Sequence, residues 1–281
     1  MPLGHELHPI RVDFAVTQDV RRFVYLYAIA ARGVHVIDSG VAGAETALAD
    51  RLRSAGRSLD EVRSILLTHA HPDHIGGASR IKDASHATVF ASVADKPWIE
   101  DIDLQFAQRP IPNFYGLVNQ SVLVDRVVAD GAVLPLEDGV TLRVVDASGH
   151  SAGSVCFLWV EQGVLFTGDA VPVPGDIPIY TSASASIATL RRLLALDGVT
   201  TYMSAWDEPC DAETGKARIR SGLDHLVQID DAVRAFLAET PDADFDTTYA
   251  RVCAALSLTH LTDNPLFRTS VAANVREVRA Q

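Results

Sequence analysis

A short segment near residue 70 gathers most of the side chains in this chain that could bind a metal. It reads Thr68, His69, Ala70, His71, Pro72, Asp73, His74. His69 and His71 are two positions apart, so on an extended chain both would point to the same side. Pro72 would end the strand, and the turn would bring Asp73 and His74 back toward the same point. Imidazole and carboxylate groups that meet in this way bind Zn²⁺, Fe or Mn, so the segment predicts a metal site.

Two later residues could complete this site. His150 stands between Gly149 and Ser151, just after a predicted strand over 141–145, and Asp169 directly follows another short apolar strand. Either residue alone would be ordinary turn chemistry. Together with the segment near residue 70 they are donors at successive strand ends, so we expect both to be metal ligands.

Composition limits the possible functions. The chain has 281 residues, 48% hydrophobic residues and a formal net charge of −12, which is typical of a globular protein and argues against a nucleic-acid partner. It shows no stretch long enough to span a membrane, and residues 1–10 lack the features of a secretory signal. We therefore expect a cytoplasmic protein that acts on a small molecule.

The elements that must position the donors alternate between strand and helix. We expect a hairpin over 23–37, helices over 45–55, 78–83 and 92–99, and strands over 64–67 and 87–91. A loop-like insertion follows over 102–120. Short hairpins are expected over 122–170, then a helix over 184–196 and a strand over 200–204. Two mixed halves with outer helices predict an α/β fold, a four-layer αββα sandwich. Residues 1–210 would form this catalytic domain, and 211–281 a helical extension packed on it.

Four motifs in this order resemble the metallo-β-lactamase-fold hydrolase superfamily over about residues 23–205. They are Ile37-Asp38-Ser39-Gly40, Thr68 to Gly77, Gly149-His150-Ser151 and Thr167-Gly168-Asp169. The resemblance implies that His69, His71 and His150 hold one metal ion. It also implies that Asp73 and His74 hold a second, that Asp169 bridges the two, and that Asp38 lies beneath the site.

One position departs from the family pattern. The family usually closes the second metal site with a histidine after the last strand, where this chain has Trp206. Asp207, the next residue, could supply an oxygen ligand instead, or the second metal could have fewer protein ligands. We expect Asp207 to be a ligand. Two divalent ions are expected, and zinc is the first candidate. Fe or Mn stay open as alternatives, because oxygen donors favour harder metals.

The resemblance predicts a hydrolase that uses a metal-bound hydroxide to cleave an ester, thioester or lactone. Asp73 would be the catalytic residue that orients the nucleophile and passes a proton to the leaving group. Two alternatives remain: a mononuclear iron enzyme resembling persulfide dioxygenases, and a member of the fold that only binds a ligand. The C-terminal helices could cover the pocket or pair two subunits as a homodimer.

Overall fold

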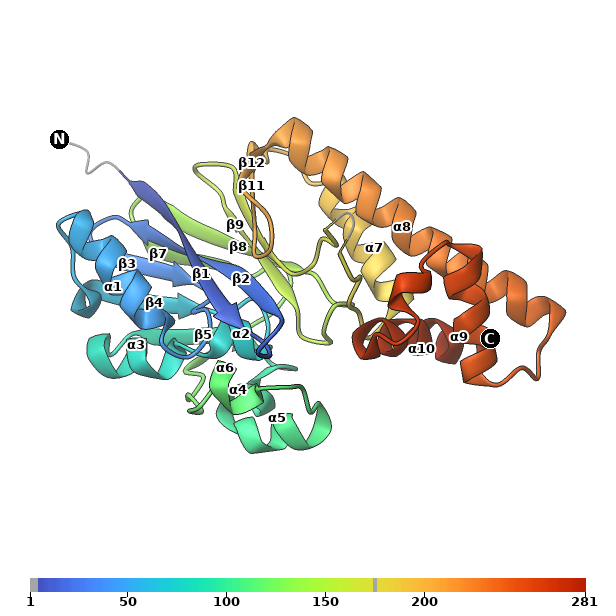
Figure 1. Cartoon of the computed structure of the whole chain (residues 1–281). Coiled ribbons are helices and arrows are strands. Elements are labelled where there is room, and N and C mark those ends of the chain that lie inside the picture. The colour runs from blue at the N-terminus through green and yellow to red at the C-terminus, as the bar shows by residue number, and fades with distance from the viewer. Residues whose placement is uncertain (1–4, 174–175) are drawn as a thin grey trace.

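Two six-stranded sheets form the centre of the computed structural model, which describes residues 5–173 and 176–281 (Figure 1). The strands are β1 (Glu6–Ala15), β2 (Arg21–Ala30), β3 (Val34–Ile37), β4 (Val62–Leu66), β5 (Thr88–Ser92), β6 (Arg126–Val128), β7 (Val133–Glu137), β8 (Val140–Asp146), β9 (Val155–Trp159), β10 (Val164–Gly168), β11 (Thr201–Ser204) and β12 (Cys210–Asp211). The helices are α1 (Ala44–Ser54), α2 (Pro72–Ile75), α3 (Ala78–Ser85), α4 (Lys96–Glu100), α5 (Ile102–Gln108), α6 (Phe114–Leu117), α7 (Ala183–Leu194), α8 (Ala212–Glu239), α9 (Phe245–Ala255) and α10 (Pro265–Arg279).

The first sheet has the order β1-β2-β3-β4-β5-β6. Its first three strands are antiparallel, whereas β3 to β6 run parallel. β4 lies in the interior of this sheet, and all but one of its residues are buried. The apolar run at 64–67 therefore ends inside the molecule, and the histidine segment begins there.

The second sheet has the order β12-β11-β10-β9-β8-β7. β7 to β10 form an antiparallel meander, and β11 pairs with β10 in parallel. The ends of β8 and β10 lead into the segments that carry His150 and Asp169. Both donors thus come from this sheet.

Three apolar clusters define four layers. One cluster lies between the sheets, with Tyr27, Phe90, Phe157 and Phe166 among its members. A second fills the space between the first sheet and α1 and α3, and the third joins the second sheet to α7, α8, α9 and α10. This arrangement confirms the αββα sandwich with added C-terminal helices.

The structure corrects several expected elements. The insertion over 102–120 contains α5 and α6 rather than only loop, and residues 126–128 pair with β5 in the first sheet instead of joining the meander. Strand β1 was not predicted. α4 begins at Lys96, because residues 93–95 form a turn before it. In the part of the chain that the structure describes, no helix is long and apolar enough to cross a membrane. The expectation that residues 1–10 carry no secretory signal concerns a segment whose first four residues lie outside the described residues.

Candidate metal centre

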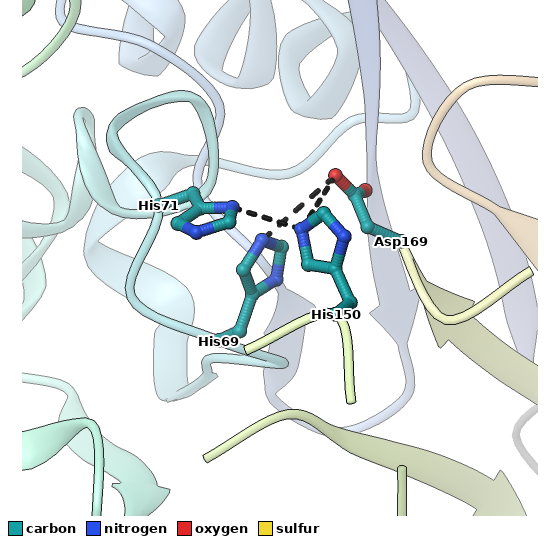
Figure 2. A group of neighbouring side chains, drawn as sticks. All are labelled: His69, His71, His150 and Asp169. Carbon is teal, nitrogen blue, oxygen red and sulfur yellow. Dashed lines mark hydrogen bonds and ion pairs between the residues drawn. The ribbon is translucent and has the colours of Figure 1, made fainter. Parts of the chain in front are cut away.

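The donors converge from different segments because their strands end on the same side of the sandwich. β4 leads into His69 and His71, and Pro72 is the first residue of α2, so the turn predicted at this proline is confirmed. His150 lies between β8 and β9. Asp169 follows the last residue of β10. Figure 2 shows the three histidine rings and the carboxylate of Asp169 facing one point.

Four of these residues form the first group, in which His69, His71, His150 and Asp169 have donor atoms within 4.8 Å of one another. Nδ1 of His71 lies 2.8 Å from Nε2 of His150. Oδ2 of Asp169 lies 3.4 Å from Nε2 of His150 and 3.8 Å from Nε2 of His69. Donors that bind one zinc ion tetrahedrally at ~2.0–2.1 Å are about 3.4 Å apart, so these spacings fit a metal ion at the centre.

The second group consists of Asp73, His74 and Asp169. Nε2 of His74 lies 3.1 Å from Oδ1 of Asp169 and 3.7 Å from Oδ2 of Asp73. Asp169 therefore belongs to both groups, with one carboxylate oxygen toward each. This is the arrangement expected of a carboxylate that bridges two cations.

Buried atoms without hydrogen-bond partners test whether the donors fit a metal. Within residues 5–173 and 176–281, these atoms include Nε2 of His69, Nε2 of His74 and Oδ1 of Asp169, which all face the donor groups. Such atoms are rare in proteins, because each costs free energy when water is excluded. Their concentration at one point indicates that a cation belongs there.

Neighbouring hydrogen bonds leave the free ring nitrogens unprotonated. Nδ1 of His74 donates to Oδ2 of Asp38 at 2.8 Å, and Nδ1 of His150 donates to the carbonyl of Ile179 at 2.8 Å. Since a neutral imidazole carries one proton, the Nε2 atom of each ring then presents a lone pair to the site. This is the tautomer that a metal ion requires.

The pKa values of the histidines reflect their burial and the charges around them. Burial lowers the pKa of His69, His71 and His150. Neighbouring positive groups lower the pKa of the first two further, whereas Asp169 partly offsets the effect of burial on His150. Burial also acts to lower the pKa of His74, but the carboxylates of Asp169, Asp38 and Asp73 outweigh it and raise that pKa well above its usual value. The carboxylates that raise this pKa are the same groups that a bound cation would neutralise.

Asp38 supports the site from below. Its Oδ1 accepts from the backbone N–H of Thr68 at 2.7 Å, and its Oδ2 accepts from the hydroxyl of Thr68 at 2.8 Å as well as from His74. Asp38 is only 3% exposed and has a left-handed backbone with φ of 58°. Its carboxylate therefore fixes both the start of the histidine segment and the ring of His74.

Two polar side chains that sequence reasoning missed hold the peptide between His69 and His71. Oδ2 of Asp95 accepts from the N–H of Ala70 at 2.9 Å, and the side-chain amide of Gln105 donates to the carbonyl of Ala70 at 2.6 Å. Both side chains are buried. No motif marks either residue, because Asp95 lies in the turn before α4 and Gln105 in α5, and only the fold brings them to Ala70.

Glycine is required at two positions beside the donors. A Cβ atom on Gly76 would lie 2.2 Å from the carbonyl oxygen of Leu117 and 2.4 Å from the backbone nitrogen of Ala42. Gly168, which precedes Asp169, has φ of 50°, and its Cβ would lie 2.6 Å from the hydroxyl of Thr68. The atoms around these two glycines thus lie too close to leave room for a Cβ.

The structure does not bring Asp207 into either donor group among the residues it describes. Its Oδ2 pairs with Nε of Arg218 at 3.0 Å, and its Oδ1 accepts from the N–H of Glu208 at 2.8 Å. Trp206 instead lies near the site, and its indole helps to lower the pKa of Asp169, after the larger effect of His74. Because an indole N–H only donates, Trp206 cannot replace the missing histidine as a ligand.

Comparisons with known proteins agree with this fold. The family model for the metallo-beta-lactamase superfamily matches residues 19–205. A hydroxyacylglutathione hydrolase of Cereibacter sphaeroides is 28% identical over 141 residues, which are 50% of this chain and 46% of that protein. A hydroxyacylglutathione hydrolase of Haemophilus influenzae is 32% identical over 158 residues, which are 53% of this chain and 71% of that protein.

The match to the Cereibacter relative thus spans about half of each protein. Among solved structures, a metallo-beta-lactamase family protein from Thermus thermophilus has a TM-score of 0.75 at 22% identity. That comparison covers 99% of this chain and 93% of the other. The match of the family model to two thirds of the chain, over the segment that carries every donor described above, shows that this protein belongs to the metallo-beta-lactamase superfamily.

Proposed function

We propose that this chain is a dinuclear metal-dependent hydrolase that cleaves a thioester or a related ester or lactone. One observation carries the proposal: two groups of buried donors share Asp169. The proposed ligands are His69, His71 and His150 for one ion and Asp73 and His74 for the other, with Asp169 common to both. The nitrogen-rich first group favours zinc, whereas the second group offers two carboxylates and admits Fe or Mn.

The relatives favour a thioester within this class. Two of them are named hydroxyacylglutathione hydrolases, at 28% and 32% identity. That activity belongs to those proteins, and the aligned segments cover only part of each chain. It supports an acyl thioester as the first substrate class to test. A small-molecule substrate, no nucleic-acid partner and a cytoplasmic location complete the proposal, in line with the net charge of −12.

The chain's own residues have distinct roles in this proposal. Two bound divalent ions would lower the pKa of water to about 7 and polarise the acyl carbonyl. Asp73 would orient the water and carry a proton to the departing sulfur. Trp206 would exclude bulk water from the side of Asp169.

The test combines metal content with thiol release. Protein purified without added metal is analysed by mass spectrometry, and acyl thioesters are then assayed by the appearance of free thiol. We expect about two metal ions per chain and turnover that Asp169→Asn abolishes. Asp207→Asn is the matched control, since it removes one carboxylate outside the donor groups. The proposal fails if metal-loaded protein binds two ions but releases no thiol.

A mononuclear iron enzyme is the alternative, and the structure provides a reason to test it. The second group has three protein donors, and Trp206 stands where the family's closing histidine would be. About one equivalent of iron, with oxygen uptake in the presence of a persulfide, would favour the dioxygenase over the hydrolase. Metal binding with neither activity would favour the ligand-binding alternative.

A further inference from the structure

Arg109 occupies a position next to the donor groups that is set by the insertion over 102–120. Helix α5 is fixed to the histidine segment, because the buried amide of Gln105 donates to the carbonyl of Ala70. Arg109 caps the end of this helix, and its N–H bonds to the carbonyl of Gln105 at 2.8 Å. Residues four apart lie on the same face of a helix. The backbone therefore presents Arg109 on the side of α5 that contacts the metal site.

Arg109 is half-buried, and its guanidinium has no protein partner among the residues that the structure describes. Within residues 5–173 and 176–281, no carboxylate lies within 4 Å of it, and its side chain makes no hydrogen bond. Among the other partly buried arginines, Arg22 pairs with Asp176 at 2.6 Å and Arg57 with Glu61 at 2.7 Å, whereas Arg143 on β8 has no such pair within the described residues. A partly buried, unpaired cation is costly and therefore unusual, above all in a chain with a net charge of −12.

The charge of Arg109 acts on the donor groups. It contributes to the lowered pKa values of His69, His71 and His150. The carboxylates of Asp73 and Asp169 favour its charged form, while burial opposes it. With two divalent ions in place, the positive charge in the site would outweigh the negative charge of these two carboxylates. Arg109 would then need an anion from outside the protein.

We propose that Arg109 binds a carboxylate of the substrate, at a position beside the acyl group that is cleaved. The guanidinium of arginine matches a carboxylate with two parallel hydrogen bonds. One arginine balances one negative charge, whereas a phosphate monoester carries about −1.5 to −2 at neutral pH. The inference rests on the proposed hydrolase function and narrows its substrate class to acyl compounds that carry a carboxylate.

A pair of matched substrates tests this inference. One is the acetyl thioester of 3-mercaptopropionic acid, and the other is the same thioester with a primary amide in place of the carboxylate. We expect wild-type protein to favour the acid in kcat/KM. In Arg109→Gln this preference should fall about 10–100-fold, the range expected for loss of a hydrogen bond between charged groups. Arg109→Lys should restore part of it, because the charge returns without the planar fork.

The control is Arg126→Gln, which removes the same charge from an exposed arginine on β6. It should leave the preference as in wild type. Metal content of each variant is measured alongside, so that a change in preference is not confused with loss of metal. If the preference for the acid survives in Arg109→Gln, or if wild-type protein shows none, the inference is overturned while the hydrolase function stands.

A binding measurement separates this inference from the proposed function. The thioethers that correspond to both substrates, with an ethyl group in place of acetyl, cannot be hydrolysed and are titrated into metal-loaded protein by NMR. If wild-type protein cleaves neither thioester, the hydrolase function fails. A preference for the thioether acid that disappears only in Arg109→Gln would still support the carboxylate subsite, and equal binding in all variants would overturn it.

Discussion

Asp38 offers the sharpest test of how the metal centre is supported. Its carboxylate accepts three hydrogen bonds at 2.7–2.8 Å while only 3% exposed. In Asp38→Asn the amide keeps one acceptor oxygen, which can serve the N–H of Thr68. Its nitrogen can donate to the hydroxyl of Thr68 but cannot accept from Nδ1–H of His74, so the bond that orients the ring of His74 is lost.

The expected cost follows from these contacts. Removal of one partner of a buried charged pair costs about 3–5 kcal/mol. Some of that cost is regained because a neutral amide is easier to bury, so we expect Asp38→Asn to lower the free energy of unfolding of the metal-free protein by about 3 kcal/mol. Asp38→Ala should lose about 1 kcal/mol more, because alanine tolerates the left-handed backbone at this position less well than asparagine.

Metal binding should weaken in the same variants. The ring of His74 is oriented through Asp38, and loss of such a partner costs about 10–100-fold in metal affinity. Urea unfolding of metal-free protein measures stability, and competition with a chromophoric chelator measures affinity. If Asp38→Asn binds both ions as tightly as wild type, Asp38 does not orient a ligand, and the reasoning from these hydrogen bonds is refuted.

Three further predictions concern packing, pH and the unconfirmed ligand. Gly76→Ala should lower the free energy of unfolding by about 2–3 kcal/mol, because its Cβ would meet backbone atoms of Leu117 and Ala42; an unchanged urea midpoint would contradict this. Burial raises the pKa of Asp95 from 3.8 to about 6, so wild-type protein should lose stability as the pH rises through about 6. Asp95→Asn mimics the protonated carboxyl and should escape this loss. The free energy of unfolding of this variant, relative to wild type, should rise by about 2–3 kcal/mol from pH 4 to pH 7.5. Urea unfolding at both pH values measures this, and a difference between variant and wild type that stays the same at both would contradict it. Asp207→Asn should leave the affinity for both ions within about twofold, since Asp207 pairs with Arg218 at the surface; a tenfold loss by chelator competition would instead make it a ligand.

Much of the sandwich could be predicted from the sequence because its strands are short and clearly bounded. The hairpin over 23–37 and the helix that begins near residue 45 agree with β2, β3 and α1. The insertion over 102–120 was harder, since its prolines and aromatic residues resemble a loop, yet α5 forms there by packing against the histidine segment. Strand β1 contains Pro9, which is tolerated because β1 is an edge strand.

The sequence by itself determined the donors near residue 70, because their spacing follows from local geometry alone: two histidines on one side of an extended chain and a proline that turns it. It also determined that His150 and Asp169 follow strands. Tertiary structure decided which distant groups complete the site. Asp95 and Gln105 form hydrogen bonds with the backbone of Ala70, and Trp206 rather than Asp207 lies near Asp169. Among the residues that the structure describes, Arg109 has no side-chain partner. These outcomes depend on how helices and sheet ends pack against each other, and no local pattern of residues encodes such contacts.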